Sequence, residues 1–241
     1  MSAALAARAA RTVDAIDWTA VAADLDLRGA AVLPRLLSDT TCARLRAAYD
    51  DPTRFRSRVV MARHGYGRGE YQYFRYPLPA EVATLREALY APLAPIANAW
   101  YARMGLEPRF PDSHAAFLAR CHAAGQTRPT PLLLRYAEGD YNHLHQDLYG
   151  EHVFPLQVAV LLSAPGTDFE GGEFVLTEQR PRQQSRVEVV RLTQGDAVVF
   201  AVNQRPVAGT RGDYRVTMRH GVSRVQSGSR MTMGIIFHDA L

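Results

Sequence analysis

The feature that most constrains the fold is a series of short apolar runs that follows Pro131 and extends to the last residues of the chain. Turn signals separate the runs, among them Pro165-Gly166, Gly171-Gly172 and Gln194-Gly195-Asp196. Short strands at such close and regular spacing are typical of β-sandwiches and jelly rolls. The sequence therefore predicts a β-rich unit over 131–241, with strands near 132–134, 157–162, 173–176, 187–190, 197–202, 214–225 and 231–238.

The first 130 residues have a different, mainly helical pattern. Ala, Leu and Arg recur at helical spacing over residues 4–50, where Ser38 to Thr41 can cap a helix at 42–49 and residues 29–34 resemble a short strand. Further helices are expected over 80–104 and 112–124. No internal repeat or linker divides the 241 residues, which are 47% hydrophobic. We therefore expect one α+β domain over 1–241, in which a C-terminal double-stranded β-helix (jelly roll) is buttressed by N-terminal helices.

The charge pattern is unusual because all 28 basic residues are Arg, against 24 acidic residues. A GC-rich genome explains this composition, and the alternative is that Arg clusters bind phosphate or carboxylate groups. Cys42 and Cys121 lie far apart, with no thiol or His at the spacing of a zinc finger, so no disulfide framework is indicated. No apolar stretch approaches the length of a membrane span, and we expect a cytoplasmic protein.

A candidate metal site begins with His145 and Asp147, whose side chains would leave the same face of a strand. Such a pair alone is more often a solvated surface feature, so a third ligand is needed. His220, in a later predicted strand, can supply it. Two imidazoles and one carboxylate leave positions for a bidentate keto acid and O₂, as in non-haem iron(II) oxygenases. Zinc can bind the same three groups and activate water.

Arg230 distinguishes these alternatives because it follows His220 by ten residues, with Thr232 on the same strand face. A buried guanidinium can form a two-pronged bond to the far carboxylate of 2-oxoglutarate, and the Thr hydroxyl can add a donor. The alternative is an ordinary Arg beside Gly228, in a chain that has 28 of them.

The order His-x-Asp, distal His and then Arg resembles the double-stranded β-helix 2-oxoglutarate/iron(II) oxygenases. Tyr136 and Gly139 match the Tyr-x-x-Gly strand of that family, and Gly171-Gly172-Glu173-Phe174 looks like its glycine turn. The matches span roughly residues 130–240. Within them, residues 144–154 and 234–239 resemble a bacterial subfamily described as acting on damaged nucleic acid.

The resemblance implies an oxidoreductase that uses iron(II), 2-oxoglutarate and O₂. His145, Asp147 and His220 would bind the metal, while Arg230, Thr232 and Tyr136 would bind 2-oxoglutarate. The implied reaction is hydroxylation or oxidative demethylation, preferentially of damaged or alkylated nucleic acid. Asp147 favours these reactions over halogenation, because related halogenases lack the carboxylate. The other histidines of this half, His143, His152 and His238, are expected to be structural or to orient the metal ligands. Asn142 is a further candidate for orienting a ligand.

Residues 54–76 interleave guanidinium groups with aromatic rings and are the candidate substrate-facing segment. Such a surface could follow a phosphate backbone and stack a displaced base. It could equally form a pocket for an acidic metabolite or a groove for a peptide, so hydroxylation of protein side chains or of a small metabolite is the alternative function. A non-catalytic iron or 2-oxoglutarate sensor is a third class, disfavoured by the complete set of ligands. The candidate substrate residues are Arg54, Arg56, Arg58, Arg63, Tyr66, Arg68, Tyr71 and Tyr73.

Overall fold

A computed structural model describes residues 12–107 and 110–241 of the chain. The predicted helices at 80–104 and 112–124 are confirmed, whereas residues 4–11 of the expected N-terminal helical stretch lie outside the described residues. The helix predicted at 42–49 begins at Asp39 rather than Cys42, because the Ser38 side chain caps it by accepting a hydrogen bond from the Thr41 amide. The helices are α2 (Trp18–Arg28), α3 (Asp39–Ala47), α4 (Ala80–Arg103) and α5 (His114–Ala123).

The strands form two antiparallel sheets. The larger sheet has the order β1-β11-β7-β14-β5-β4-β2, with β8 paired to β14, and the smaller sheet has the order β10-β9-β13-β6-β3, with β12 paired to β13. From β5 onward the chain crosses repeatedly between the two sheets, which is the topology of a jelly roll. The strands are β1 (Ala30–Leu33), β2 (Phe55–Val60), β3 (Gly67–Arg68), β4 (Glu70–Phe74), β5 (Leu132–Ala137), β6 (Tyr141–His145), β7 (Leu156–Leu161), β8 (Phe169–Gly171), β9 (Phe174–Gln179), β10 (Arg186–Val190), β11 (Ala197–Ala201), β12 (Gln204–Gly209), β13 (Gly212–Val222) and β14 (Val225–Ile235).

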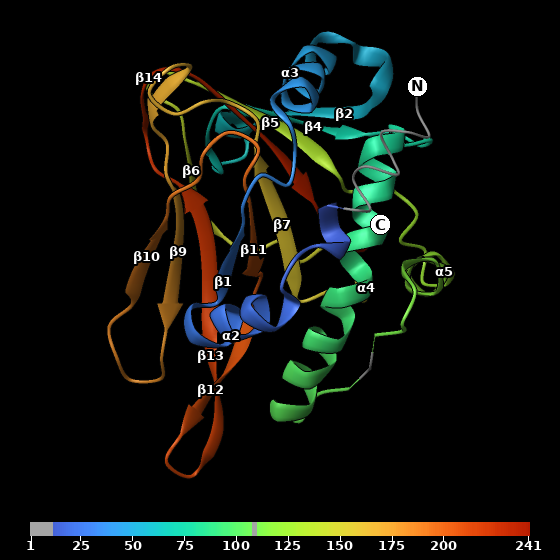
Figure 1. The fold of residues 1–241 in the computed structure, drawn as a ribbon, viewed down its shortest axis with the longest axis vertical. Helices are drawn as coiled ribbons and strands as arrows, with labels where there is room; N and C mark the ends of the chain where they lie inside the picture. Colours follow the sequence, from blue (N-terminus) through green and yellow to red (C-terminus); the bar gives the residue numbers. More distant parts are fainter. Residues whose placement is uncertain (1–11, 108–109) are drawn as a thin grey trace.

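Residues 55–74 of the first half also belong to the sheets, as β2, β3 and β4. The mainly helical pattern of this half did not indicate these strands. β4 pairs with β5, so that Tyr71 lies opposite Leu134, and β2 extends the larger sheet beyond β4. β3 pairs with β6 in the smaller sheet. The segment expected to face substrate is therefore held between the edges of both sheets, at the upper end of the molecule in Figure 1.

Helix α4 is the main helical support of the sheets and lies lengthwise beside them (Figure 1). The buried residues of α4 recur at the helical spacing that the sequence predicted. Among them, Arg86 forms a buried ion pair with Asp239, with Nη2 2.8 Å from Oδ1. No helix within the described residues is long and apolar enough to cross a membrane. The buried aromatic rings that pack around α4 and α5 are Tyr90, Phe117, Phe154 and Phe237.

Candidate metal and co-substrate site

The three predicted metal ligands meet where β6 ends against β13. His145 is the last residue of β6 and lies directly opposite His220 of β13. Asp147 follows two residues later, beyond the end of the strand rather than within it as expected. One ligand atom from each residue lies within 4.8 Å of the others, which is close enough for all three to bind one ion.

The charges of this cluster suit a divalent cation. Asp147 Oδ1 is 3.5 Å from His145 Nε2, and Oδ2 is 3.4 Å from His220 Nε2. Burial favours a raised pKa for Asp147, but the hydrogen bond and charge of His220, aided by His145, outweigh it and hold the pKa well below its usual range. Burial and the neighbouring His145 lower the pKa of His220. The cluster therefore offers a carboxylate and a neutral imidazole, the forms that bind metals.

Each imidazole is held by a different kind of contact. His145 Nδ1 donates to the carbonyl oxygen of His143 at 2.8 Å, which leaves Nε2 free on the side of Asp147. Within the described residues, His220 Nδ1 has no hydrogen-bond partner. The His220 ring packs against Phe200 and Phe174, at 4.6 and 6.0 Å between centroids. The contact between His143 and His145 is therefore made by the backbone of His143 and not by its side chain.

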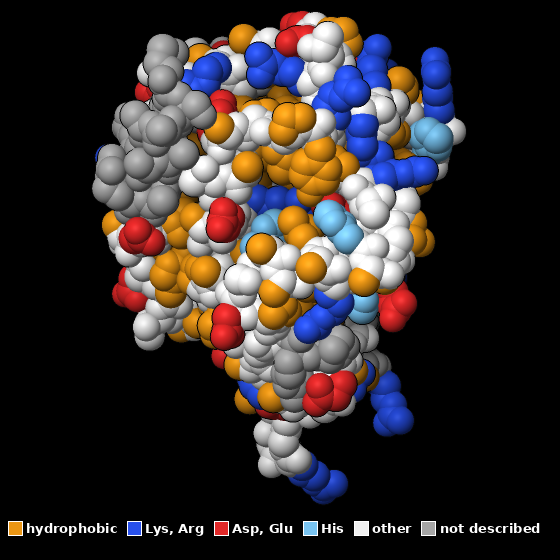
Figure 2. Space-filling view, turned by 90° about the vertical axis from the view of Figure 1, so that its right-hand side faces the viewer, with side chains coloured by type: hydrophobic (Ala, Val, Ile, Leu, Met, Phe, Trp, Pro, Cys, Tyr) orange, Lys and Arg blue, Asp and Glu red, His pale blue; other side chains and the backbone are white. Residues whose placement is uncertain are grey.

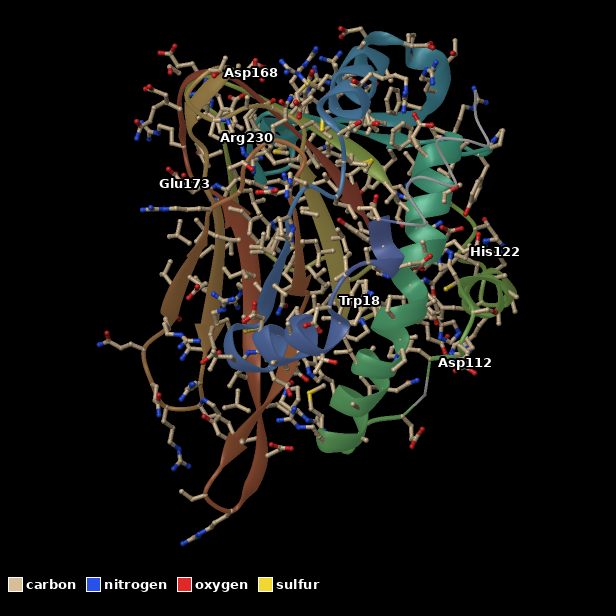
Figure 3. All side chains as sticks on the ribbon, in the orientation of Figure 1. Trp18, Asp112, His122, Asp168, Glu173 and Arg230 are labelled. Atoms are coloured by element: carbon tan, nitrogen blue, oxygen red, sulfur yellow. The ribbon has the colours of Figure 1, made fainter. Side chains whose placement is uncertain are left out.

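Arg230 lies on β14 directly opposite Tyr136 of β5, and its side chain is only 3% exposed. No carboxylate in 12–107 or 110–241 forms an ion pair with its guanidinium, and Nε is buried without a hydrogen-bond partner. Burial lowers the pKa of Arg230 to about 10. Figure 3 shows Arg230 inside the upper end of the molecule, near Asp168 and Glu173. A buried guanidinium without a carboxylate partner is suited to an anionic ligand.

The glycine turn provides the space that Arg230 occupies. Gly171 and Gly172 both have positive φ, 71° and 63°. A Cβ on Gly172 would lie 2.8 Å from Arg230 Cδ, and a Cβ on Gly171 would lie 2.5 Å from the carbonyl oxygen of Arg224. The paired glycines are therefore explained by close packing against β14.

One cavity of about 330 Å³ joins the metal ligands to Arg230. Tyr136 and Thr232 also line it, so every predicted metal and 2-oxoglutarate residue faces the same space. The Tyr136 hydroxyl is buried and forms no hydrogen bond of good geometry with any described residue, although the Asn142 side chain lies beside it. Three predicted substrate residues belong to the wall, namely Tyr66, Tyr71 and Tyr73.

The five predicted substrate arginines do not line this cavity. Arg54 pairs with Asp51, Arg58 with Glu70, and Arg68 lies 3.8 Å from Asp140. Arg56 donates to the Pro129 carbonyl and lies over the Tyr73 ring, whereas Arg63 is exposed. Figure 2 shows basic side chains gathered on the upper right of the face that it draws, the end at which β2 and β4 lie in Figure 1. Contact between these arginines and a substrate stays a prediction.

The sequence assigned no role to three polar residues that line the cavity or support its wall. Gln157 of β7 lines the cavity, and its buried Oε1 has no hydrogen-bond partner in 12–107 or 110–241. Tyr149 donates to Asp147 Oδ1 at 2.6 Å. Gln126 is fully buried and binds the backbone of the segment that carries Tyr149. A signal existed for Gln157, which interrupts an otherwise apolar strand.

Comparisons with known proteins identify a family. The model of a family described as "Oxygenase, catalysing oxidative methylation of damaged DNA" matches residues 69–240. Two uncharacterized proteins of Mycobacterium tuberculosis are each 54% identical over 167 residues, which cover 69% of this chain and 72% of theirs.

Solved structures share the fold at low sequence identity. A prolyl hydroxylase from Trichoplax adhaerens, in complex with a hypoxia inducible factor peptide fragment, has a TM-score of 0.56 at 13% identity and covers 95% of this chain and 90% of its own. A Burkholderia pseudomallei oxidoreductase of the 2OG-Fe(II) oxygenase family has a TM-score of 0.54 at 17% identity, with 94% and 93% covered. A Pseudomonas putida prolyl-4-hydroxylase has a TM-score of 0.53 at 15% identity, with 93% and 99% covered. The predicted α+β jelly-roll fold is confirmed.

Proposed function

Because this chain belongs to the oxygenase family described as catalysing oxidative methylation of damaged DNA, we propose that His145, Asp147 and His220 bind iron(II) beside a 2-oxoglutarate site at Arg230. Iron(II) with 2-oxoglutarate and O₂ would supply the oxidant for hydroxylation of a C–H bond in the substrate. The donor set fits this ion, since two imidazoles and one carboxylate on one side leave positions for a keto acid and O₂.

The observation that carries the proposal is the buried guanidinium of Arg230, which has no carboxylate partner among the described residues and lies in the same cavity as the metal ligands. A guanidinium binds a carboxylate through two parallel hydrogen bonds, and a dry site strengthens both of them. Thr232 and Tyr136 supply hydroxyl groups in the wall beside it. A zinc hydrolase needs only its metal ligands and a water for its chemistry, whereas a keto acid that binds the metal also brings a second carboxylate for a cation to hold.

We further propose damaged or alkylated nucleic acid as the substrate. Tyr66 is 49% exposed and lines the cavity with Tyr71 and Tyr73, which provides aromatic surfaces for a base displaced from its stack. Stacking alone does not select a base over other flat groups, and the family description supports the choice. If the oxidised carbon is an N-methyl group, the hydroxylated product releases formaldehyde.

Succinate formation tests the reaction and the substrate together. Purified protein with iron(II), ascorbate and 2-oxoglutarate is offered alkylated single- and double-stranded DNA, RNA, peptides and a panel of metabolites. We expect succinate with alkylated nucleic acid and none with the Asp147→Ala variant. Turnover with a peptide or a metabolite, but not with nucleic acid, would contradict the substrate and leave the chemistry intact.

Metal identity is tested separately from turnover. Anaerobic addition of 2-oxoglutarate to the iron(II) protein should produce the visible absorption band of the chelate. The Arg230→Met variant should require much more 2-oxoglutarate to produce the band. Absence of the band with wild-type protein, together with tightly held zinc, would favour a hydrolase.

A further inference from the structure

We propose that Tyr149 is a positioning residue, which fixes the Asp147 carboxylate for metal binding and connects it to the tyrosine wall of the cavity. The inference rests on the proposed function of the same site. Tyr149 lies within the segment 144–154 that resembles the bacterial subfamily, but the sequence assigned it no role. Its role follows from the contacts at both of its ends.

The contact with Asp147 is short and buried. The Tyr149 hydroxyl donates to Oδ1 at 2.6 Å, the length of a hydrogen bond between a hydroxyl and a carboxylate. Asp147 lies beyond the end of β6, so the strand ladder does not fix its side chain. The hydroxyl restricts rotation of the carboxylate and leaves Oδ2 facing His220. Partners of this kind set the orientation of metal ligands.

The backbone of Tyr149 is itself anchored by Gln126, which follows α5. The side-chain amide of the fully buried Gln126 donates to the carbonyl oxygen of Tyr149 at 3.0 Å and to that of His152 at 3.1 Å. Its Oε1 accepts from the His152 amide at 2.8 Å. Gly150 has φ 103°, and a Cβ there would collide with the amide of Gln126. The segment after Asp147 is therefore held in one conformation, which is what a residue that positions a ligand requires.

The other side of Tyr149 faces the cavity. Its hydroxyl interacts with that of Tyr73, which interacts with that of Tyr71. The rings of Tyr71 and Tyr73 meet edge to face at 5.4 Å between centroids, and Arg56 lies 4.4 Å from the Tyr73 ring centre. All three tyrosines line the cavity. A row of hydroxyl groups therefore runs from the Asp147 carboxylate to the wall that a substrate would touch.

The deciding measurement is metal affinity without substrate, made by anaerobic titration with cobalt(II), whose visible spectrum reports ligand geometry. Tyr149→Phe keeps the ring and removes the hydroxyl. We expect about 10- to 100-fold weaker binding and a changed cobalt spectrum, as loss of such partners typically causes. Tyr101→Phe is the matched control, because Tyr101 packs against Phe110 away from the cavity, and this variant should bind cobalt as the wild type does.

The outcomes separate the inference from the proposed function. If Asp147→Ala abolishes tight binding while Tyr149→Phe has wild-type affinity and spectrum, the inference is overturned and the metal site stands. If Asp147→Ala also binds normally, both are overturned. Should Tyr149→Phe fail to fold, as judged by circular dichroism, Tyr73→Phe replaces it. That variant should weaken cobalt binding a few-fold with a smaller spectral change, and no change would overturn the inference.

Discussion

Arg230 and Tyr136 lie directly opposite each other on β14 and β5, with the guanidinium carbon 5.7 Å from the centre of the tyrosine ring. This pairing places a buried cation and a buried hydroxyl side by side in the wall of one cavity. Neighbouring strands of an antiparallel sheet hold such pairs rigidly. The proposed site for 2-oxoglutarate is therefore built on the sheet itself and not on a loop.

Arg230→Lys should raise the KM for 2-oxoglutarate by roughly tenfold or more, because one charged hydrogen bond contributes about 1.5–3 kcal/mol and the ammonium cannot form the two-pronged contact. Steady-state succinate formation over a range of 2-oxoglutarate concentrations measures it. Arg219→Lys, an exposed position on β13, is the control. An unchanged KM in Arg230→Lys would remove this residue from the co-substrate site.

Gly172→Ala should impair 2-oxoglutarate binding as well as stability. The positive φ of 63° costs an Ala residue about 1–2 kcal/mol, and its Cβ would press on Arg230 Cδ. Gly139→Ala separates the two effects, because Gly139 has φ 82° with nothing within 4 Å of the added Cβ. Both variants should unfold at lower urea concentration, and only Gly172→Ala should raise the KM. Equal KM values for the two variants would show that the glycine turn does not shape the site.

His114 should make the protein less stable in acid. Burial, reinforced by the charge of Arg86, lowers the pKa of His114 from 6.5 to about 4, and its Nε2 donates to the Phe237 carbonyl. Between pH 6.5 and 4 the unfolded chain binds a proton at this position that the folded protein does not. The free energy of unfolding therefore falls as pH decreases through this window, by on the order of 3 kcal/mol for this residue.

Urea unfolding of His114→Gln at several pH values tests this expectation, because Gln can still donate to the carbonyl but does not titrate. Its stability should vary less with pH in the same window than that of the wild type. His64→Gln, at an exposed position, is the control and should follow the wild-type profile. Parallel profiles for all three proteins would contradict the assignment.

Removing one charge of the Arg86–Asp239 ion pair should lower the free energy of unfolding. Asp239→Asn leaves the buried Arg86 charge unpaired and should destabilise the protein by about 3–5 kcal/mol. Arg86→Met should cost less, because Asp239 keeps His122 and Tyr76 as partners. The double variant should lose less than the sum, because no charge is left unpaired. Urea unfolding of the four proteins measures the coupling, and additive losses would show that the pair does not act as a unit.

The arginines near β2 should contribute to nucleic-acid binding by neutralising phosphates. Changing Arg54, Arg56 and Arg58 together to Ala should weaken binding and reduce its salt dependence, by about 0.9 in the log–log slope for each phosphate that is no longer neutralised. Filter binding at several salt concentrations measures this slope. The control is a second triple variant, which has the same change in net charge at exposed positions outside this segment. It should weaken binding less, and equal weakening by the two variants would show that the arginines near β2 are not the binding site. The control positions are Arg182, Arg211 and Arg219.

The parts of the fold that depend on local periodicity were predictable from the sequence. Helix α4 repeats apolar residues near the helical period, whereas β7 and β11 were recognisable as short apolar runs between turn signals. The strands β2 to β4 were not anticipated, because Arg and Gly interrupt the alternation that would have marked them. Gly67 and Gly69 are there to allow close approach to β6 and to Tyr136, a reason that only the tertiary structure provides.

The candidate site divides in the same way. His145, Asp147, His220 and Arg230 were found because their spacing is set by strand lengths within one continuous unit. No role was assigned to Tyr149, although it lies within 144–154, because its contact with Asp147 depends on the conformation of a loop. Gln126 was missed because its partners, such as Asp239, lie far along the chain. Asp147 was expected on a strand and lies just past one, which is why it needs a hydroxyl to hold it.

The opposition of His145 and His220 across β6 and β13 has a consequence for folding. A slip of one residue between these strands would turn one of the two rings to the opposite face of the sheet. A bound ion would therefore stabilise the native register but not the slipped one. The free energy of this stabilisation grows with the logarithm of the metal concentration above Kd. Metal supply during synthesis would then influence how much of the chain reaches the correctly paired sheet.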